Sequence, residues 1–172
     1  MLTRLAILPH SRLGARPRMH RALPHLQLDQ LPHDEAMEEL IERSLEIPGV
    51  RSKQSRMASP SSRALYLADE LALGPPEAFI DENEFCHLHP PPECGIHLTL
   101  PKLLRVEVVR LGWGERHPIA EVGLLTTLVT VYAPRNRPEM GTVLGLIGHS
   151  CHFAKGKLQV LYGQERSLRE TR

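Results

Sequence analysis

The stretch EFCHLHPPPECGIHLTLP, residues 84–101, decides the expected fold, because it has the pattern of two strands joined at three consecutive prolines. Side chains in a strand alternate between its two faces. The first strand therefore directs Phe85, His87 and His89 to one face. The returning strand directs His97 to the face opposite its aliphatic residues, Ile96, Leu98 and Leu100. A slip of one residue would expose those aliphatic side chains, so burial fixes the register and brings the three imidazoles to one side.

The segments around this hairpin alternate between helical and extended patterns. Helices are expected over 34–47, 101–113 and 136–155, with Asp34 and Asn136 as N-caps and Pro101 in a first turn. The middle helix is expected to bury Leu103, Leu104, Val108 and Leu111. Further strands are expected around 50–57, 63–73 (or a short helix there) and 128–134, with a loop at GWGERHP, residues 112–118. This order predicts an α+β fold: a single domain whose mainly antiparallel sheet has helices packed on one face.

The chain of 172 residues is long enough to bury one core, and its ends differ in composition from its middle. Residues 1–33 hold five arginines before the first acidic residue and are expected to form a flexible extension, in which His25 is solvated. Residues 34–158 are expected to form the α+β domain. Residues 159–172 are expected to form a polar C-terminal tail.

Charge and motifs narrow the classes of function. The formal net charge is +1, so the balance of charges implies no nucleic-acid partner. The longest apolar stretches are too short to span a bilayer as a helix, and no P-loop or dinucleotide-binding glycine motif is present. The three cysteines form no C-x-x-C unit and are expected to be reduced. These features predict a soluble, cytoplasmic protein with no nucleic-acid partner and no membrane partner.

The histidines of the hairpin carry the clearest chemical signal. Neighbouring protonated imidazoles repel one another, which favours neutral rings whose lone pairs are available for a proton or a cation. His117, which precedes a proline in a loop, is a fourth candidate. His87, His89, His97 and His117 together would suit a divalent transition metal such as zinc, iron or copper. The alternative is that they are structural residues of strands and turns.

Aromatic residues and one arginine near these segments are candidates for a ligand pocket. Phe85 and Tyr132 would contribute an apolar rim for a flat organic molecule. Trp113, between two glycines, is either a pocket wall or an anchor in the core. Arg135 either clamps an anionic group with its planar guanidinium or pairs with a nearby acid.

Several ordered segments resemble the luciferase-domain family, which comprises the luciferases of bioluminescent fungi and their bacterial relatives. These segments are HLHPPPECGIHLTL, GWGERHPIA and VYAPRN, which run from His87 to Asn136. The resemblance implies an oxygen-dependent oxidoreductase, an oxygenase that adds dioxygen to a small electron-rich pyrone, phenol or enol. The fungal members carry an N-terminal membrane anchor, for which this sequence shows no candidate.

The resemblance also implies roles for individual residues. By matching position, His87, His89, His97 and His117 would be catalytic residues, or metal ligands where a metal is bound. Trp113, Glu115, Arg116, Tyr132 and Arg135 would support substrate binding, together with the Phe85 of the apolar rim. Dioxygen would be the cosubstrate. A domain of this fold that binds a small ligand or a metal without catalysis is the alternative function.

Overall fold

The protein is described by a computed structural model over residues 10–158. The α-helices in this range are α1 (Asp34–Leu45), α2 (Lys102–Arg110), α3 (Pro118–Glu121) and α4 (Arg137–Ala154), and short 3-10 helices occur at Asp69–Leu71 and Pro76–Ala78. The strands are β1 (Val50–Gln54), β2 (Arg63–Leu67), β3 (Glu84–His89), β4 (Gly95–Thr99), β5 (Gly114–Arg116) and β6 (Leu128–Val131). The features expected of residues 1–9 and of the tail at 159–172 lie outside the described residues.

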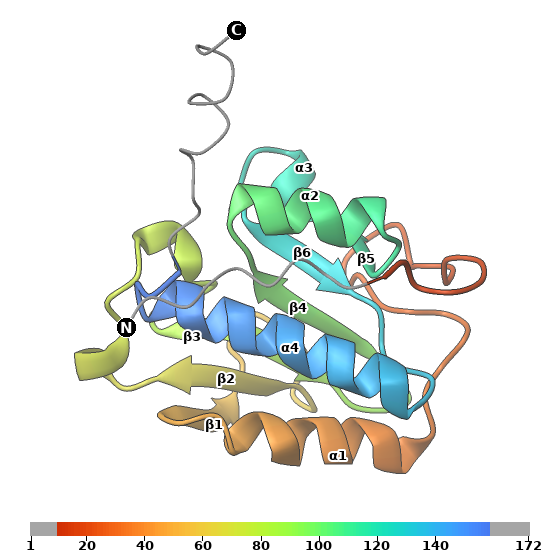
Figure 1. Ribbon diagram of the computed structural model, residues 1–172, viewed down its shortest axis with the longest axis horizontal. Coiled ribbons are helices and arrows are strands. Elements are labelled where there is room, and N and C mark those ends of the chain that lie inside the picture. Colours follow the sequence, from red (N-terminus) through yellow and green to blue (C-terminus); the bar gives the residue numbers. More distant parts are fainter. Residues whose placement is uncertain (1–9, 159–172) are drawn as a thin grey trace, which may run out of the picture.

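The six strands form one antiparallel sheet in the order β1-β2-β3-β4-β6-β5, with the expected hairpin of β3 and β4 at its centre. Helices α1, α2 and α4 lie across the same side of this sheet (Figure 1). The structure therefore confirms the predicted α+β fold. Among the helices described between residues 10 and 158, none combines the length and the apolar character that crossing a membrane requires.

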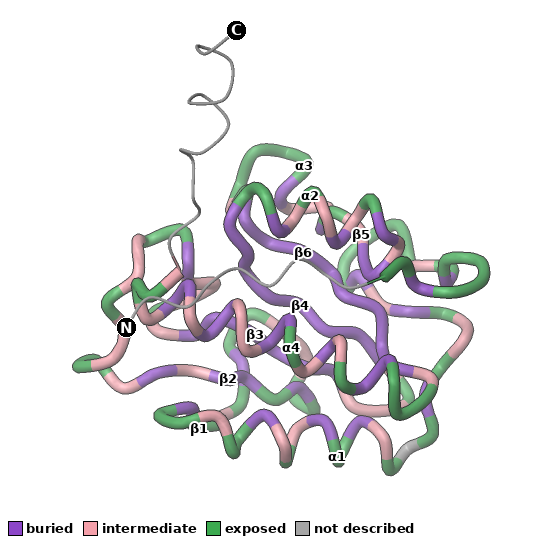
Figure 2. The backbone as a smooth tube through the Cα atoms, viewed as in Figure 1, coloured by how far each residue is buried: buried purple, intermediate pink, exposed green. Residues whose placement is uncertain are grey.

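The hydrophobic core lies between the helices and the sheet. Leu88, Ile96 and Leu98 alternate along β3 and β4 as predicted, and they belong to the same buried cluster as Val143 and Ile147 of α4. Every residue of β3 and β4 is buried, so both faces of the central hairpin are covered (Figure 2). The face without α4 is covered by loops and by part of the N-terminal segment.

Three local predictions need correction. Asp34 is the first residue of α1 and not its cap, because His33 keeps an extended backbone and forms the boundary. Leu103 is 42% exposed, since Leu104 and Val108 are spaced by one helical turn and take the buried face of α2. The expected loop at 112–118 contains β5 and the start of α3, because pairing with β6 orders a strand too short to show a sequence pattern.

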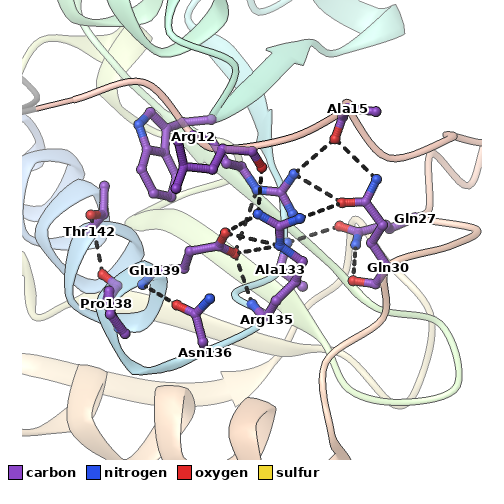
Figure 3. Close-up of polar contacts among 12 residues, drawn as sticks. Arg12, Ala15, Gln27, Gln30, Ala133, Arg135, Asn136, Pro138, Glu139 and Thr142 are labelled. Atoms are coloured by element: carbon purple, nitrogen blue, oxygen red, sulfur yellow. Dashed lines mark hydrogen bonds and ion pairs between the residues drawn. The ribbon is translucent and has the colours of Figure 1, made fainter.

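Residues 10–33, here called the N-terminal strap, are attached to the domain by a polar network (Figure 3). Arg12 is only 7% exposed, and its Nε lies 3.6 Å from the Glu139 carboxylate at the start of α4. Gln30 Oε1 accepts hydrogen bonds from Arg12 Nη1 at 3.2 Å and from Arg135 Nη1 at 3.1 Å. Arg135 also donates to Glu139. The strap is therefore fixed at the point where β6 leads into α4.

Hydrogen bonds of Gln27 extend this attachment to the centre of the sheet. Its side-chain Oε1 accepts a hydrogen bond from the Ala133 N–H at 2.9 Å, and its backbone N–H donates to the Cys94 carbonyl at 3.1 Å. His25, between these attachments, is only 3% exposed. The prediction that His25 is solvated is therefore wrong, because the strap packs against β4 and β6. The domain boundaries drawn from the sequence stay a prediction.

Candidate functional site

A cavity of about 1000 Å³ lies against the histidine-bearing face of the central hairpin. Its polar wall consists of imidazoles: His25, His87, His89, His97 and His117. Most of its remaining lining is apolar and comes from the strap, loops, α3 and the start of β6, including Leu23, Met57, Ile80, Ile119, Leu124, Leu125 and Leu128. A mostly apolar hollow with a few convergent polar groups is the usual form of a small-molecule site.

The register of β3 and β4 brings three of these histidines together. His87 and His97 are direct cross-strand partners, and His87 Nε2 lies 2.9 Å from His97 Nδ1. The ring of His89 lies 5.3 Å from that of His87 and 5.0 Å from that of His97, measured between centroids. Each of the three side chains is at most 4% exposed. The predicted grouping of the three imidazoles is confirmed.

Two further histidines reach the same cavity from other segments. His117 is the N-cap of α3, and its ring centroid lies 4.7 Å from that of His97. Its Nδ1 accepts a hydrogen bond from the Ile119 N–H at 3.2 Å. His25 of the strap lies 5.3 Å from His117 between ring centroids, and its backbone carbonyl lies 2.9 Å from His97 Nε2. The predicted convergence of His117 is confirmed, and His25 is an addition.

A β-bulge changes which side chain stands beside His87. On β2, Leu65 pairs with Cys86 but the next residue, Tyr66, pairs with Glu84, which leaves Phe85 without a partner. The extra residue shifts the alternation, so Glu84 and not Phe85 lies next to His87. Glu84 Oε1 is 2.7 Å from His87 Nδ1. The expectation that Phe85 shares the histidine face is wrong, and Phe85 is fully buried in the hydrophobic core.

Glu84 and Glu93 hold two of the imidazoles in place. Glu84 is 1% exposed and accepts hydrogen bonds from Ser55 Oγ at 2.9 and 3.1 Å. Glu93 Oε2, in the turn of the hairpin, lies 3.3 Å from His89 Nδ1. Glu93 also accepts a short hydrogen bond from Ser59, which is the main reason that its pKa lies below the ordinary value.

Burial lowers the pKa of His89, His97 and His117 and keeps these three rings neutral near pH 7. It lowers the pKa of His97 well below the ordinary value, and nearby His87, His89 and His117 lower it further. Burial is also the largest cause of the lowered pKa of His89, followed by the charge of His87. The pKa of His117 falls to about 4, again mainly through burial and then through His25. These three rings therefore have one protonated nitrogen and one lone pair each.

Glu115 and Tyr132, two of the residues predicted to bind substrate, contact the site through His25. Glu115 Oε1 lies 2.9 Å from His25 Nε2, and Tyr132 donates a hydrogen bond to Glu115 Oε2 at 3.0 Å. His25 Nδ1 lies 2.8 Å from Thr130 Oγ1. Burial and the Glu115 carboxylate raise the pKa of Tyr132, so its hydroxyl stays protonated. Neither Glu115 nor Tyr132 lines the cavity.

The other predicted substrate-binding residues also lie outside the cavity lining. Trp113 is 1% exposed and donates to the His10 carbonyl at 2.8 Å, which agrees with its interpretation as an anchor in the core. Arg135 pairs with Glu139, which agrees with the second of its two interpretations. Arg116 donates to the Ala120 carbonyl at 3.2 Å. The substrate-binding role of these residues stays a prediction.

Among residues 10–158, two overlapping groups of histidines are close enough to hold a metal ion. They are His87, His89 and His97, and His25, His97 and His117, and within each group one nitrogen from each ring lies within 4.8 Å of the others. The sequence predicted four of these five side chains. It missed His25, Glu84 and Glu93. Glu93 could have been identified from the sequence, since it lies in the turn of the same hairpin. The bulge that brings Glu84 to the site and the course of the strap that brings His25 there have no recognisable sequence pattern.

Fold and site together define an α+β domain with a cluster of buried histidines at one wall of an apolar cavity. Residues 82–150, which include β3, β4 and most of α4, match the Luciferase domain family. The chain is 30% identical over 174 residues to a luciferase of Neonothopanus nambi, an alignment that covers 90% of this chain and 65% of that protein. It is 29% identical over 160 residues to luciferases of Armillaria ostoyae and Armillaria gallica, covering 83% of this chain and 59% of each.

The chain therefore carries a luciferase-like domain, and the resemblance predicted from the sequence is confirmed. It spans between 59% and 65% of the length of these three relatives. No solved structure matches the chain.

Proposed function

We propose that this protein is an oxygen-dependent oxidoreductase, an oxygenase that acts on a small electron-rich enol, pyrone or phenol in the histidine cavity. The observation that carries the proposal is the gathering of five buried imidazoles at one wall of a large apolar cavity within a luciferase-like domain. The name luciferase, which the fungal relatives bear, favours oxygen chemistry. The cavity favours a small organic substrate.

The chemistry follows from the spin state of dioxygen. Triplet dioxygen reacts with a closed-shell organic molecule only after an electron becomes available, either from a deprotonated enol or from a metal. His89 is suited to accept the proton of an enol, because Glu93 faces its Nδ1 and its Nε2 has no hydrogen-bond partner. His89 Nε2 is therefore available to act as a general base or as a metal ligand.

His117 is suited to the opposite role. Its Nδ1 accepts the Ile119 N–H, so the neutral ring carries its proton on Nε2 and donates from that nitrogen. Such a donor in a mostly apolar cavity stabilises a developing enolate or peroxide oxygen more strongly than it would in bulk solvent. The two histidines thus support a division of labour between proton acceptance and oxyanion stabilisation.

The proposal is tested by measuring oxygen uptake with a panel of electron-rich pyrones and phenols. We expect uptake by the wild-type chain and a loss of at least about 100-fold in His89→Gln, the lower end of the range for removal of a general base. His33→Gln is the matched control, because His33 is exposed at the N-cap of α1. Uptake that His89→Gln leaves intact would contradict the proposal.

The alternative function is a non-catalytic module that binds a small ligand or a metal in the same cavity. The size of the apolar lining favours it as a second candidate. Tight binding of the same pyrones or phenols without oxygen uptake would support the module and contradict the enzyme. The cytoplasmic location expected from the sequence stays a prediction.

A further inference from the structure

Three histidines of the site share one hydrogen-bond pattern: each has one ring nitrogen facing an acceptor. His87 Nδ1 faces Glu84 at 2.7 Å, His89 Nδ1 faces Glu93 at 3.3 Å, and His97 Nε2 faces the His25 carbonyl at 2.9 Å. A carboxylate or a backbone carbonyl accepts, so each ring donates through that nitrogen. In the neutral ring the other nitrogen then holds the lone pair.

The three remaining nitrogens, His87 Nε2, His89 Nε2 and His97 Nδ1, belong to rings arranged around one point. The ring centroids are separated by 4.9, 5.0 and 5.3 Å, so they form a nearly equilateral triangle. Three imidazoles that bind one tetrahedral metal at about 2.0–2.1 Å have centroids about 5 Å apart. The observed triangle therefore has the dimensions of a three-histidine metal site.

A cation also resolves two unfavourable features of these rings. His87 Nε2 and His97 Nδ1 are 2.9 Å apart, and if a proton joins them one of these two rings must donate from both of its nitrogens and carry a buried charge. His89 Nε2 is buried without a hydrogen-bond partner. A cation held between the three rings satisfies all three lone pairs while each ring stays neutral.

We propose that His87, His89 and His97 bind one divalent first-row transition metal, with Glu84, Glu93 and the His25 carbonyl as the groups that orient the ligands. Neutral imidazole nitrogens suit zinc, iron, nickel and copper, whereas magnesium and calcium prefer oxygen ligands. Three protein ligands leave a coordination position for an exogenous molecule, as in catalytic metal sites. The role of this metal site rests on the proposed function, because a metal is one of the two means by which an oxygenase can activate dioxygen.

The same reasoning leaves His117 and His25 out of the ligand set. His117 Nδ1 is occupied by the Ile119 N–H, and the two nitrogens of His25 face Thr130 Oγ1 and Glu115. The centroid separations of the second group, His25, His97 and His117, are 4.7, 5.3 and 6.3 Å and form no regular triangle. The proposal thus reduces the four ligands predicted from the sequence to three.

The test uses the full chain, stripped with a chelator and titrated with Co²⁺ and Zn²⁺. We expect one metal per chain by elemental analysis, with a Co²⁺ absorption spectrum of the intense type that four- or five-coordinate sites give. His89→Gln and His97→Gln should lose this binding, while His117→Gln and the control His33→Gln should keep it. Glu93→Gln removes an orienting carboxylate and should weaken affinity by about 10- to 100-fold.

Circular dichroism of each variant shows whether it is folded. If a ligand variant fails to fold, the metal affinity of Glu93→Gln tests the proposal in its place. The proposal is overturned if the folded wild-type chain binds no stoichiometric metal, if His89→Gln binds as tightly as wild type, or if His117→Gln loses the metal. Oxygen uptake by metal-free protein would overturn the role of the metal centre in activating dioxygen while leaving the proposed oxygenase intact. Stoichiometric metal binding without oxygen uptake would support the centre and count against the oxygenase.

Discussion

The two faces of the central hairpin are equally buried, yet they are held in different ways. The face toward α4 consists of aliphatic side chains such as Leu88 and Leu98, which belong to the hydrophobic core. The opposite face consists of imidazoles that are joined to carboxyl groups, such as His87 to Glu84. The first face is stabilised by close packing, so the volume of each side chain matters. The second face is stabilised by hydrogen bonds, so each buried donor needs an acceptor.

This difference teaches that burial alone does not distinguish core from site. A buried aliphatic residue is stabilised by burial, whereas a buried imidazole loses hydration and requires a partner. The protein supplies these partners from the bulge in β3, through Glu84, and from the distant strap, through the carbonyl of His25. Substitutions on the two faces should therefore destabilise the protein for different reasons, and different second substitutions should restore its stability.

The largest expected effect is on the polar face. His87→Ala leaves the buried Glu84 without its imidazole partner, and breaking a buried pair in this way costs about 3–5 kcal/mol. Adding Glu84→Gln should recover part of that loss, because it removes the buried charge that has lost its imidazole and keeps only Ser55. Urea unfolding of both single variants and of the double variant gives the coupling energy. Strictly additive losses would refute the pairing as the source of stability.

On the apolar face, Leu98→Ala should lower the free energy of unfolding by about 2–5 kcal/mol, because it leaves a cavity beside α4. Leu98 is 0% exposed and belongs to the core cluster. No change of a polar partner should rescue this variant, whereas Leu98→Met, which conserves volume, should cost less than about 1.5 kcal/mol. Equal losses for Ala and Met would show that packing is not what holds this face.

A smaller effect is expected at the network that holds the N-terminal strap. Arg135→Ala removes the hydrogen bonds of Arg135 to Gln30, to Glu139 and to the Leu13 carbonyl. Loss of these contacts should cost about 1–3 kcal/mol. Amide exchange within residues 10–33 should increase more than exchange in β3 and β4. Uniform acceleration across the chain would instead mean that the strap and the sheet open together.

The smallest effect concerns pH. Burial raises the pKa of Glu139, but the hydrogen bonds of Arg135 and the charge of Arg12 outweigh it, so the pKa in the folded state is lowered. The stability that Glu139 contributes is therefore present above its unfolded pKa of about 4.3 and is lost as the pH falls through its folded value. At neutral pH the free energy of unfolding of the wild type should be about 1 kcal/mol larger than that of Glu139→Gln. Unfolding measured down the acid range should show this gap closing, and a constant gap would contradict the assignment.

Much of the fold could be predicted from local patterns. The period of two in residues 84–101 fixed the hairpin and its register, and Asn136 correctly marked the start of α4. Predictions failed where partners from elsewhere in the chain decide the outcome. The strand β5 depends on pairing with β6, and the bulge at Phe85 depends on how β2 and β3 align. Neither interaction has a local sequence pattern.

The site divides in the same way. Alternation in a strand is a local property of the backbone, so the sequence by itself determined that His87, His89 and His97 share a face. Tertiary structure decided which nitrogen of each ring faces an acceptor, because Glu84 and the His25 carbonyl reach the rings only through the bulge and the strap. Ring chemistry depends on those contacts. The His25 contact joins segments far apart in the chain, and the Glu84 contact depends on a bulge that forms where β3 pairs with β2, so both follow from packing and not from local conformational preference.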